Sequence, residues 1–600
     1  MNSTYTGKIL RVDLGRRDFR EETIDPELAR AYIGGRGYAT RIICDEVDPT
    51  VDALDPANKL ILATGPLTGT SAACGGRYMA ITKGALTGTI ACSNSGGNFG
   101  PELKYAGYDM IVLEGAASEP LVLVIDDGSV GLRPAGDLWG RTVHETEDLL
   151  HAQLGGGFKC VSIGPAGEKL VRFACIMNDK NRAAGRSGVG AVMGSKKLKA
   201  IAVRGTGGLV AADPPAFREA CLDAVAKLKA GPVTGTGLPK FGTAVLVNII
   251  NESGAFPTRN FQQGQFESAE KISGETIAEQ ILVRIRACVA CPIACGRVTW
   301  VKDGKFRGRG EGPEYETIWS LGAAVGVSDL PAATKANYIC NELGMDTISA
   351  GATIACAMEL FEKGVISEAD VGRSLRFGDG EALVDVMDKI GRREGFGDVL
   401  AEGSARVAKK YGRPELFMGV KGQEFPAYDP RGVFGMGVQY ATSNRGACHV
   451  RGYMISAEIL GVPRKMDPLT TEGKAAMNIV FQDLTAALDS CGVCLFVVFS
   501  IGAPELSTML SKATGWAYDV SEFMRVGERI WNLERLFNQR AGFGKKDDTL
   551  PRRLLEDPMP GGPAAGRTVP LDEMRGEYYR LRGWDDQGRP TKDKLASLGL

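Results

Sequence analysis

Apolar and polar positions alternate through the first two hundred residues with the period of β-strands. In residues 10–14, Leu, Val and Leu alternate with Arg and Asp, as in a half-buried strand. Residues 121–132 read as a hairpin whose turn is Asp126-Asp127-Gly128. Further apolar runs, separated by glycine-rich turns, occupy residues 60–63, 111–113 and 198–203. This part of the chain is therefore predicted to be β-rich, with long loops.

After about residue 210 the apolar residues recur at helical spacing. Phe217, Cys221, Ala224 and Leu228 predict a helix over residues 215–229. Similar patterns predict helices at residues 276–286, 349–363, 381–393, 399–410, 485–488 and 523–537. Residues 548–600 are rich in proline, glycine and charge, and we expect an irregular strap over the surface there.

Composition limits the possible functions without choosing one. The 600 residues exceed one ordinary core, so two to four domains are expected. A net charge of −1 gives no support for binding to nucleic acid or to an anionic membrane. Fourteen cysteines in a chain of this length fit a reducing compartment better than a disulfide scaffold. Because no targeting segment and no apolar run of about 18 residues appears, the cytoplasm is the expected location.

The clearest chemical motif is a group of three closely spaced cysteines, Cys288, Cys291 and Cys295. Three close thiols and one distant thiol are typical of a 4Fe–4S cluster, which needs four thiolates. A zinc site more often pairs two Cys-x₂-Cys knuckles, and no second knuckle is present. Cys494 is the candidate fourth ligand, although by spacing alone Cys491 and Cys448 compete with it.

Loops of the N-terminal region place arginine or asparagine among small residues. They lie at residues 65–77, 94–97 and 181–188. Glycine lets backbone N–H groups approach an anion, and arginine binds phosphate with two parallel hydrogen bonds. A large phosphorylated ligand is one interpretation, and solvated turns are the other. Neither a P-loop nor a dinucleotide fingerprint supports ordinary ATP or NAD binding.

Two six-residue turns in the helical part resemble each other. Residues 341–346 (NELGMD) and 489–494 (DSCGVC) share an Asp or Asn, a glycine three residues later and an Asp or Cys at the end. Both follow predicted helices, so each glycine can end a helix. A matched pair of turns could hold two halves of one ligand.

With these features together, the chain resembles the tungsten-containing aldehyde:ferredoxin oxidoreductases, the tungstopterin enzymes. The resemblance runs almost end to end. It is carried by the cysteine motif, by both turns and by the segments GPLTGT (65–70), IMND (176–179), RAAGR (182–186), GPEYE (312–316) and FPAYDPRG (425–432).

This resemblance implies an α+β multidomain fold. A β-rich base domain (1–210) would support the cofactor, followed by a helical domain with the cysteine motif (211–417) and a helical domain with the fourth cluster cysteine (418–600). It also implies two pterin dithiolenes around one tungsten, with no protein ligand to the metal. A magnesium ion would link the pterin phosphates, and one 4Fe–4S cluster would have Cys494 as its fourth ligand.

The resemblance carries over site residues by matching motif. The backbone carbonyls of Asn94 and Ala183 would hold magnesium. Pterin contacts would come from Arg77, Asn94, Gly96, Arg182, Ala183, Gly185, Arg186, Asn341, Met345, Asp346, Arg451, Asp489, Val493 and Leu495. An acid is usual in the family where Asn341 stands; because an amide both donates and accepts, the hydrogen bond can survive with altered strength.

Glu316 and His449 match an active-site glutamate and histidine. We therefore expect oxidation of an aldehyde to a carboxylic acid, with Glu316 as general base and His449 as a hydrogen-bond partner of the developing oxyanion. Reverse acid reduction would be possible with a strong donor. The alternatives are a related tungsten reductase subunit acting on an aromatic thioester and an electron carrier that holds only the cluster.

One departure from the family concerns assembly. Several members form dimers through a metal bound by a Glu-x-x-His on a helix, and here Lys335 and Tyr338 stand at those positions. Neither side chain suits a divalent metal at pH 7. We therefore predict no bridging metal, and an iron–sulfur partner such as ferredoxin or a ferredoxin-like subunit, with a flavoprotein using NAD as a possible further subunit.

Overall fold

Two six-stranded β-sheets form the N-terminal part of the molecule. The computed structural model describes residues 3–600. The first sheet has the order β2 (Asp18–Thr23), β1 (Lys8–Asp13), β6 (Met110–Glu114), β3 (Leu60–Thr64), β4 (Tyr78–Lys83), β5 (Ile90–Ser95). The second has the order β11 (Arg182–Ala184), β10 (Ile176–Asn178), β9 (Lys159–Ser162), β12 (Leu198–Arg204), β7 (Leu121–Asp126), β8 (Ser129–Pro134). The predicted β-rich region is confirmed.

The sheets are mainly antiparallel, with one parallel pair in each. β1 runs parallel to β6, and β12 runs parallel to β7. The predicted hairpin is present: β7 and β8 pair from Asp126↔Ser129, so two residues make the turn, and Asp127 adopts a positive φ of 49°. Short helices cover the sheets, namely α1 (Pro26–Tyr32), α2 (Gly35–Glu46), α3 (Phe99–Tyr105), α4 (Val143–Leu154), α5 (Pro165–Glu168) and α6 (Val189–Ser195).

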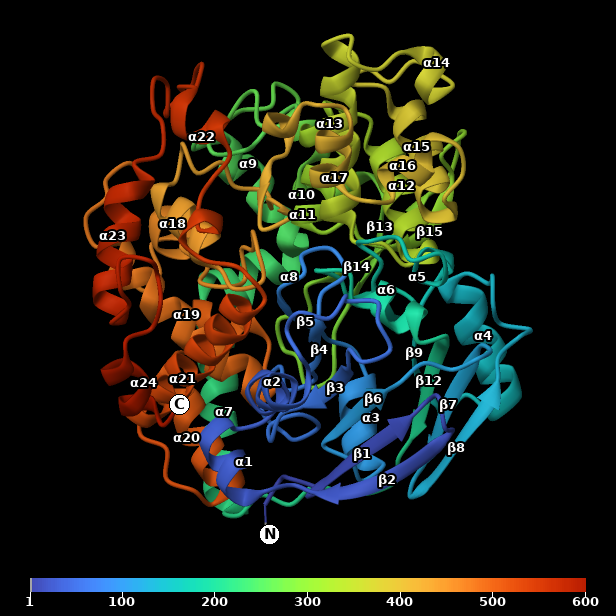
Figure 1. Cartoon of the computed structure of the whole chain (residues 1–600), viewed down its shortest axis with the longest axis vertical. Coiled ribbons are helices and arrows are strands. Elements are labelled where there is room, and N and C mark those ends of the chain that lie inside the picture. Colours follow the sequence, from blue (N-terminus) through green and yellow to red (C-terminus); the bar gives the residue numbers. More distant parts are fainter. Residues whose placement is uncertain (1–2) are drawn as a thin grey trace.

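The rest of the chain is mainly helical. Figure 1 shows the helices of residues 330–410 above the sheets and those of the C-terminal part beside them. The middle helices are α7 (Pro214–Ala230), α8 (Leu238–Phe241), α9 (Leu246–Glu252), α10 (Gly274–Gln280), α11 (Tyr315–Ser320), α12 (Leu330–Leu343), α13 (Thr347–Glu362), α14 (Glu368–Val371), α15 (Gly380–Arg392), α16 (Phe396–Leu400) and α17 (Ser404–Lys410). The last are α18 (Phe434–Thr442), α19 (Lys474–Cys491), α20 (Ala503–Thr514), α21 (Val520–Arg540), α22 (Arg552–Glu556), α23 (Leu571–Arg582) and α24 (Lys592–Leu598).

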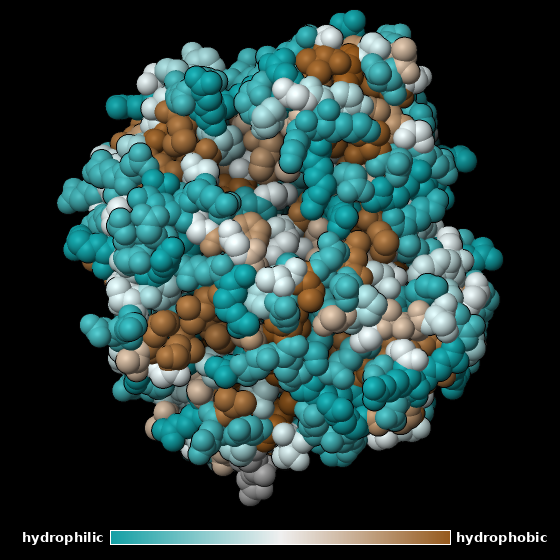
Figure 2. All heavy atoms as spheres, in the orientation of Figure 1, coloured by the Kyte–Doolittle hydropathy of each residue, from teal (hydrophilic) through white to brown (hydrophobic). Residues whose placement is uncertain are grey.

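The predicted fold class, a β-rich base followed by mainly helical parts, is confirmed, while the divisions at residues 210 and 417 stay predictions. One apolar core runs through both parts, because α2 of the N-terminal region packs against α19 and α21. Figure 2 shows a mainly hydrophilic face with separate apolar patches. Within residues 3–600, no helix combines the length and the apolar character needed to cross a membrane.

Three local predictions were wrong. Residues 276–286 are not one helix: α10 ends at Gln280, and β13 (Leu282–Arg286) pairs with β14 (Gly296–Val301), which pairs with β15 (Gly308–Glu311). The cysteine motif therefore joins two strands, whereas the predicted helix over residues 276–286 would have placed it between or at the ends of helices. β-Branched Val283 and Ile285 favour a strand once a partner strand is available.

The other two errors concern continuity. The helix predicted over residues 399–410 is broken between α16 and α17, where Gly403 has a positive φ of 86°. The tail is not irregular, because α22, α23 and α24 lie within residues 548–600. Proline and glycine separate these helices but do not prevent them; Thr591, for example, caps α24 by accepting the N–H of Lys594.

Candidate functional site

A cavity of about 560 Å³ lies where the two sheets meet the helical parts. This volume is in the usual range for sites that hold a cofactor or substrate. Of the residues predicted to bind cofactor, the wall contains Arg77, Asn94, Gly96, Arg182, Ala183, Gly185, Arg186, Asn341, Met345, Asp346, Arg451, Asp489 and Leu495. Val493 is fully buried behind its turn and does not line the cavity.

The floor of the cavity is the junction between the two sheets. Edge strands β5 and β11 pack against each other there, which brings Asn94 and Ala183 to the same place. Arg77, just before β4, donates to the side-chain oxygen of Asn94 (3.1 Å). Asn178 on β10 donates to the carbonyl of Gly96 (2.8 Å), so a residue of the second sheet fixes the loop that follows the first.

The first of the two similar turns joins α12 to α13 and rests on the second sheet. Gly344 ends α12 with a φ of 76°, as the sequence predicts, and Asp346 caps α13 by accepting the N–H of Ile348. The N–H of Asp346 donates to the carbonyl of Phe173 (3.0 Å). The Asp346 carboxylate also pairs with Arg186 at 3.1 Å, which connects this turn to the loop of residues 181–188.

The second turn follows α19 and rests on the first sheet. Gly492 ends α19 with a φ of 82°. Its carbonyl accepts the N–H of Arg77 (3.2 Å), and the N–H of Leu67 donates to the carbonyl of Cys491 (3.0 Å). Each sheet thus supports one turn, and the two turns face the same cavity.

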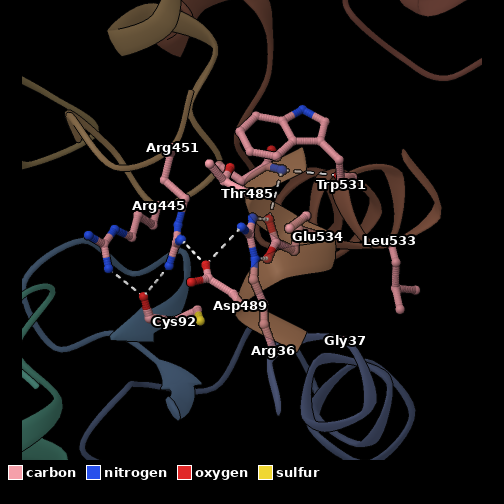
Figure 3. Close-up of polar contacts among 12 residues, drawn as sticks. Arg36, Gly37, Cys92, Arg445, Arg451, Thr485, Asp489, Trp531, Leu533 and Glu534 are labelled. Atoms are coloured by element: carbon pink, nitrogen blue, oxygen red, sulfur yellow. Dashed lines mark hydrogen bonds and ion pairs between the residues drawn. The ribbon is translucent and has the colours of Figure 1, made fainter. Parts of the chain in front are cut away.

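Arginines compensate the charge of the second turn. Asp489 lies between Arg451 and Arg36, pairing directly with Arg451 and at 3.4 Å with Arg36 (Figure 3). Arg36 is fully buried and also binds Glu534 through two contacts of 2.7 and 2.8 Å. Arg445 and Arg451 both donate to the carbonyl of Cys92 (Figure 3). Of these arginines, Arg445 and Arg451 line the cavity, and Arg445 has no acidic partner in the described residues, so it brings positive charge that suits an anionic ligand.

Five cysteines, not four, surround a second, small cavity directly beside the first. Cys288, Cys291, Cys295 and Cys494 line it, as the sequence predicts, and Cys74 lines it as well. Of the competing fourth thiols, neither Cys448 nor Cys491 lines this cavity. Because Cys295 and Cys494 also line the larger cavity, the two sites share a wall.

The surroundings of the thiols fit an iron–sulfur cluster. Arg77 donates to the sulfur of Cys494 (2.8 Å) and so supplies positive charge beside a thiolate. The hydrogen bond from Cys74, helped by backbone N–H groups, lowers the pKa of Cys291 to about 6. Burial raises the pKa of Cys295 and Cys494, and a bound metal would overcome this because it deprotonates a coordinating thiol.

Gly96 lies close to the side chains of Cys288 and Arg77. A Cβ at this position would lie 2.9 Å from the sulfur of Cys288 and 3.2 Å from the guanidinium carbon of Arg77. The Gly96 backbone therefore separates the cysteine cavity from the larger one at close contact. Only glycine permits that approach without displacing its neighbours.

Glu316 and His449 face each other at the wall of the larger cavity. Glu316 lies in the first turn of α11, and His449 lies in the loop after α18. The Nδ1 atom of His449 lies 3.7 Å from the Oε1 atom of Glu316, and within residues 3–600 neither atom has a hydrogen-bond partner. The other oxygen of Glu316 accepts the N–H of Ala427 (2.8 Å). Two unpartnered polar atoms at a cavity wall are available to a substrate.

Burial sets the protonation of both groups. It raises the pKa of Glu316 to about 8, although the Ala427 N–H and Arg186 oppose the rise. Burial, followed by the charges of Arg186, Arg445 and Arg451, holds the pKa of His449 well below its usual value. Near pH 7 the histidine is therefore neutral, with one N–H donor and one acceptor nitrogen. The arrangement can move a proton and donate a hydrogen bond.

The sequence did not point to several residues of the site. Cys74 lies in the glycine-rich loop before Arg77. The presence of a cysteine in a predicted ligand-binding loop was the one sequence feature that could have indicated it. Tyr428 and Tyr453 flank His449, each with its ring centre 6.3 Å from the imidazole. Tyr453 then packs edge-on against Phe499 (5.6 Å), so an apolar wall leads away from the Glu316–His449 pair.

Lys335 and Tyr338, for which the sequence predicts no bridging metal, differ in exposure. Tyr338 is only 6% exposed, and its hydroxyl hydrogen-bonds to Thr299 on β14 at 2.7 Å. Its ring packs on Gly308 and Gly310 of β15, where an added Cβ would overlap it. Lys335, one helical turn earlier, is partly exposed. These contacts give Tyr338 a structural role within the chain.

Family models match both halves of the chain. The N-terminal domain of aldehyde ferredoxin oxidoreductase matches residues 9–205, and domains 2 and 3 match residues 219–600. The tungsten-containing aldehyde ferredoxin oxidoreductase of Pyrococcus abyssi is 54% identical to this chain, over 99% of both chains. The enzyme of the same name from Pyrococcus furiosus is 53% identical, over 99% of this chain and 98% of its own.

The chain is also more distantly similar to proteins whose names describe other activities. A subunit of Pyrococcus furiosus described as the WOR-like subunit of an aliphatic sulfonate oxidoreductase is 29% identical over 99% of this chain and 97% of its own. A solved structure, the active-site complex BamBC of benzoyl coenzyme A reductase, superposes with a TM-score of 0.86 at 25% identity. It covers 100% of this chain and 98% of that one.

Proposed function

Because this chain belongs to the aldehyde ferredoxin oxidoreductase family, we propose that it oxidises aldehydes to carboxylic acids at a tungsten bis-pterin centre. The electrons would leave through a 4Fe–4S cluster to a ferredoxin-type carrier. The observation that carries this proposal is the pair of adjoining cavities: one holds Glu316 and His449 between two matched turns, and the other is lined by cysteines.

The cofactor contacts follow from the two matched turns. We propose that one pterin lies against residues 341–346 with Arg182 and Arg186, and the other against residues 489–495 with Arg77 and Arg451. The carbonyls of Asn94 and Ala183 are the proposed magnesium ligands, since β5 and β11 meet at the cavity floor. Asn341 donates weakly to the carbonyl of Glu311 (3.3 Å) and to Asn181 (3.4 Å), so its amide can turn toward a pterin.

A tungsten bis-pterin held by the two turns would supply two-electron chemistry, and a cluster held by the four cysteines would supply one-electron transfer. The protein supplies the proton chemistry. The free oxygen of Glu316 is placed to accept a proton from water or from an aldehyde hydrate, while its other oxygen stays fixed by Ala427. A neutral His449 is placed to donate a hydrogen bond to the developing oxyanion. Acid reduction would use the same groups in reverse.

The proposed 4Fe–4S cluster and tungsten centre predict a fixed ratio of iron to tungsten in the protein. Four cysteine ligands and one bis-pterin site imply an iron-to-tungsten ratio of about four. Cys288→Ala, Cys291→Ala or Cys295→Ala should lose the cluster, because a cube needs four thiolates. Elemental analysis of the purified, fully loaded enzyme measures the ratio. A ratio far from four, or iron retained in all three variants, would contradict the assignment.

Turnover distinguishes the proposed activity from its alternatives. Reduction of a viologen dye by acetaldehyde or benzaldehyde supports aldehyde oxidation. An electron carrier that holds only the cluster would contain no tungsten. A reductase acting on an aromatic thioester would instead show no aldehyde-dependent dye reduction, and it is favoured only by the fold similarity to benzoyl coenzyme A reductase.

A further inference from the structure

An exposed, cationic β-sheet borders the proposed cluster. The cysteine motif is the loop between β13 and β14, and the small cysteine cavity is lined by Arg286 at the end of β13 and Gly296 at the start of β14 (Figure 1). β13 is an edge strand, because the sheet order is β13-β14-β15. Its outer edge therefore has backbone groups without a strand partner.

Large apolar side chains of this sheet are exposed. Val283 and Ile285 on β13 are 45% and 49% exposed, and Trp300 on β14 is 44% exposed. Lys302 lies over the Trp300 ring, 5.7 Å from its centre. Exposed aromatic and aliphatic groups beside cations are typical of interaction surfaces, where an apolar anchor has a charged rim.

The charge of the sheet contrasts with that of the whole chain. Between residues 282 and 311, the bounds of this sheet, there are seven cationic side chains and two acidic ones, in a protein whose net charge is −1. Arg286 and Lys305 are paired with acids, and Arg297 is buried. The remaining four cations have no ion pair within the described part of the chain: Arg284, Lys302, Arg307 and Arg309.

We propose that the β13–β14–β15 sheet is the docking surface for an acidic iron–sulfur electron carrier of the ferredoxin type. The inference rests on the proposed function. Electrons that reach the cluster must leave across the nearest surface, and the cysteine loop is part of this sheet. Complementary charge would speed encounter and orient the carrier. Trp300, which pairs with Arg309 across the strands and shares a sheet face with Arg284, would provide the apolar contact.

Charge reversal tests the surface. Arg284→Glu combined with Arg309→Glu should raise the KM for a small acidic ferredoxin at least about tenfold, because two of the four unpaired cations become acidic. Reduction of methyl viologen, which needs no docking surface, should stay within about twofold of the unaltered enzyme. Arg133→Glu, on exposed β8 of the other large sheet, is the control. It changes the net charge by the same amount as Arg309→Glu alone, and that single variant should already raise the KM for ferredoxin while Arg133→Glu should not.

The outcomes separate the two proposals. An unchanged KM for ferredoxin in the double variant, or an equal rise in Arg133→Glu, would overturn the docking surface. Failure of the unaltered, metal-loaded enzyme to reduce viologen with any aldehyde would instead overturn the proposed activity. Ferredoxin-linked turnover of the unaltered enzyme should also weaken at high salt, and this salt dependence should be smaller in the double variant.

A second inference concerns the fifth thiol at the cysteine cavity. The sulfur of Cys74 lies 3.6 Å from that of Cys291, and Cys74 is only 2% exposed. Its N–H donates to the carbonyl of Ala290 (2.8 Å), and its carbonyl accepts the N–H of Cys494 (3.2 Å). Cys74 is therefore fixed between the two segments that supply the four proposed ligands, and it has a positive φ of 59°.

We propose that Cys74 is a positioning residue whose S–H donates a hydrogen bond to the sulfur of Cys291 and raises the reduction potential of the cluster. Four thiolates complete a cube, so the fifth thiol can keep its proton. A donor at a ligand sulfur stabilises the reduced cluster, which carries one more negative charge, and cluster potentials depend on such hydrogen bonds. This inference also rests on the proposed cluster.

Two variants test the donor. Cys74→Ala removes it and should make the midpoint potential of the cluster more negative in a redox titration followed by electron paramagnetic resonance. Cys74→Ser keeps a hydroxyl donor and should stay closer to the unaltered protein. Both should retain the full iron content.

The opposite results are equally specific. An unchanged potential in fully loaded Cys74→Ala would overturn the hydrogen bond. Loss of the cluster in Cys74→Ala and its retention in Cys291→Ala would also overturn it, because Cys74 would then be a ligand. Absence of iron from the unaltered protein would overturn the cluster assignment itself.

Discussion

Glu316 and His449 illustrate how burial prepares single side chains for chemistry. Each has one unpartnered atom directed at the other, across 3.7 Å. Their pKa values are shifted in opposite directions, upward for the acid and downward for the histidine, so both are uncharged near pH 7. Desolvation favours the neutral form of either group, and this common cause explains the opposite shifts.

Replacing the acid should separate chemistry from cofactor binding. Glu316→Gln is nearly isosteric but cannot accept a proton. We expect it to retain iron and tungsten and to lose about 10²-fold or more in kcat. Metal analysis and steady-state kinetics on the same preparation check this. Near-normal turnover of the loaded variant would remove Glu316 from the mechanism.

The pH profile follows from the same carboxyl group. A general base must be deprotonated, and the pKa of Glu316 is raised to about 8. Below pH 8 the active fraction falls as the group becomes protonated, so kcat should drop about tenfold per pH unit on the acid side and level off above pH 8. A kcat that stays constant from pH 6 to pH 9 would contradict this assignment.

The role of His449 can be tested by replacing it with an aromatic residue that lacks a hydrogen-bond donor. It lies between Tyr428 and Tyr453, so phenylalanine can fill the same space among aromatic rings. His449→Phe should fold and bind metals but lose the hydrogen-bond donor, with a fall in kcat similar to that of Glu316→Gln. Thermal unfolding and metal content provide the control for folding.

At the scale of elements, the two turns depend on glycines that end helices. An added Cβ on Gly492, which has a φ of 82°, would lie 2.0 Å from the hydroxyl oxygen of Thr68. Gly372 ends α14 with a φ of 80° and has open space around it. The two positions share a left-handed backbone, but only Gly492 is packed against residues of the first sheet region, Gly65 and Thr68.

This pair gives a matched experiment. Gly372→Ala should lower the free energy of unfolding by about 1–2 kcal/mol, the cost of a left-handed conformation for alanine. Gly492→Ala should cost at least about 1–3 kcal/mol more, because the turn must move away from Thr68. Since Asp489 and Cys494 move with it, iron content should fall as well. Equal destabilisation and full iron in both variants would contradict the role given to this turn.

At the scale of the whole molecule, Lys335 and Tyr338 bear on how the protein assembles with other chains. Tyr338 packs within the protein and Lys335 is cationic, so neither side chain suits a divalent metal at this position. We therefore expect purified native enzyme without a metal between two Lys335–Tyr338 segments, bound to separate electron-transfer subunits. Native mass spectrometry with metal analysis checks this.

Two results would contradict that expectation. A stoichiometric homodimer with a metal between the two segments would contradict the first half. A metal-free homodimer that is fully active with free ferredoxin and carries no bound subunit would contradict the second, because losing a metal does not abolish an interface.

The sequence by itself determined the local features of this protein. Alternating apolar residues predicted the hairpin of β7 and β8. A glycine after a helical pattern predicted the end of the helix at both turns. Both features depend on residues that are close together in the chain. The spacing of Cys288, Cys291 and Cys295 likewise predicted a thiol site. The roles of Arg186, Asp489 and the other cavity residues came from family resemblance and not from local pattern.

Only the tertiary structure decided what lies together from distant parts of the chain. β13 is a strand because β14, beyond the cysteine loop, is available as its partner, whereas local periodicity alone predicted a helix. Cys74 reaches Cys291, and Glu316 reaches His449, because two sheets and a shared helical core position these segments. The physical reason is that local spacing fixes neighbours within a turn or two, while long-range contacts depend on packing of the whole core.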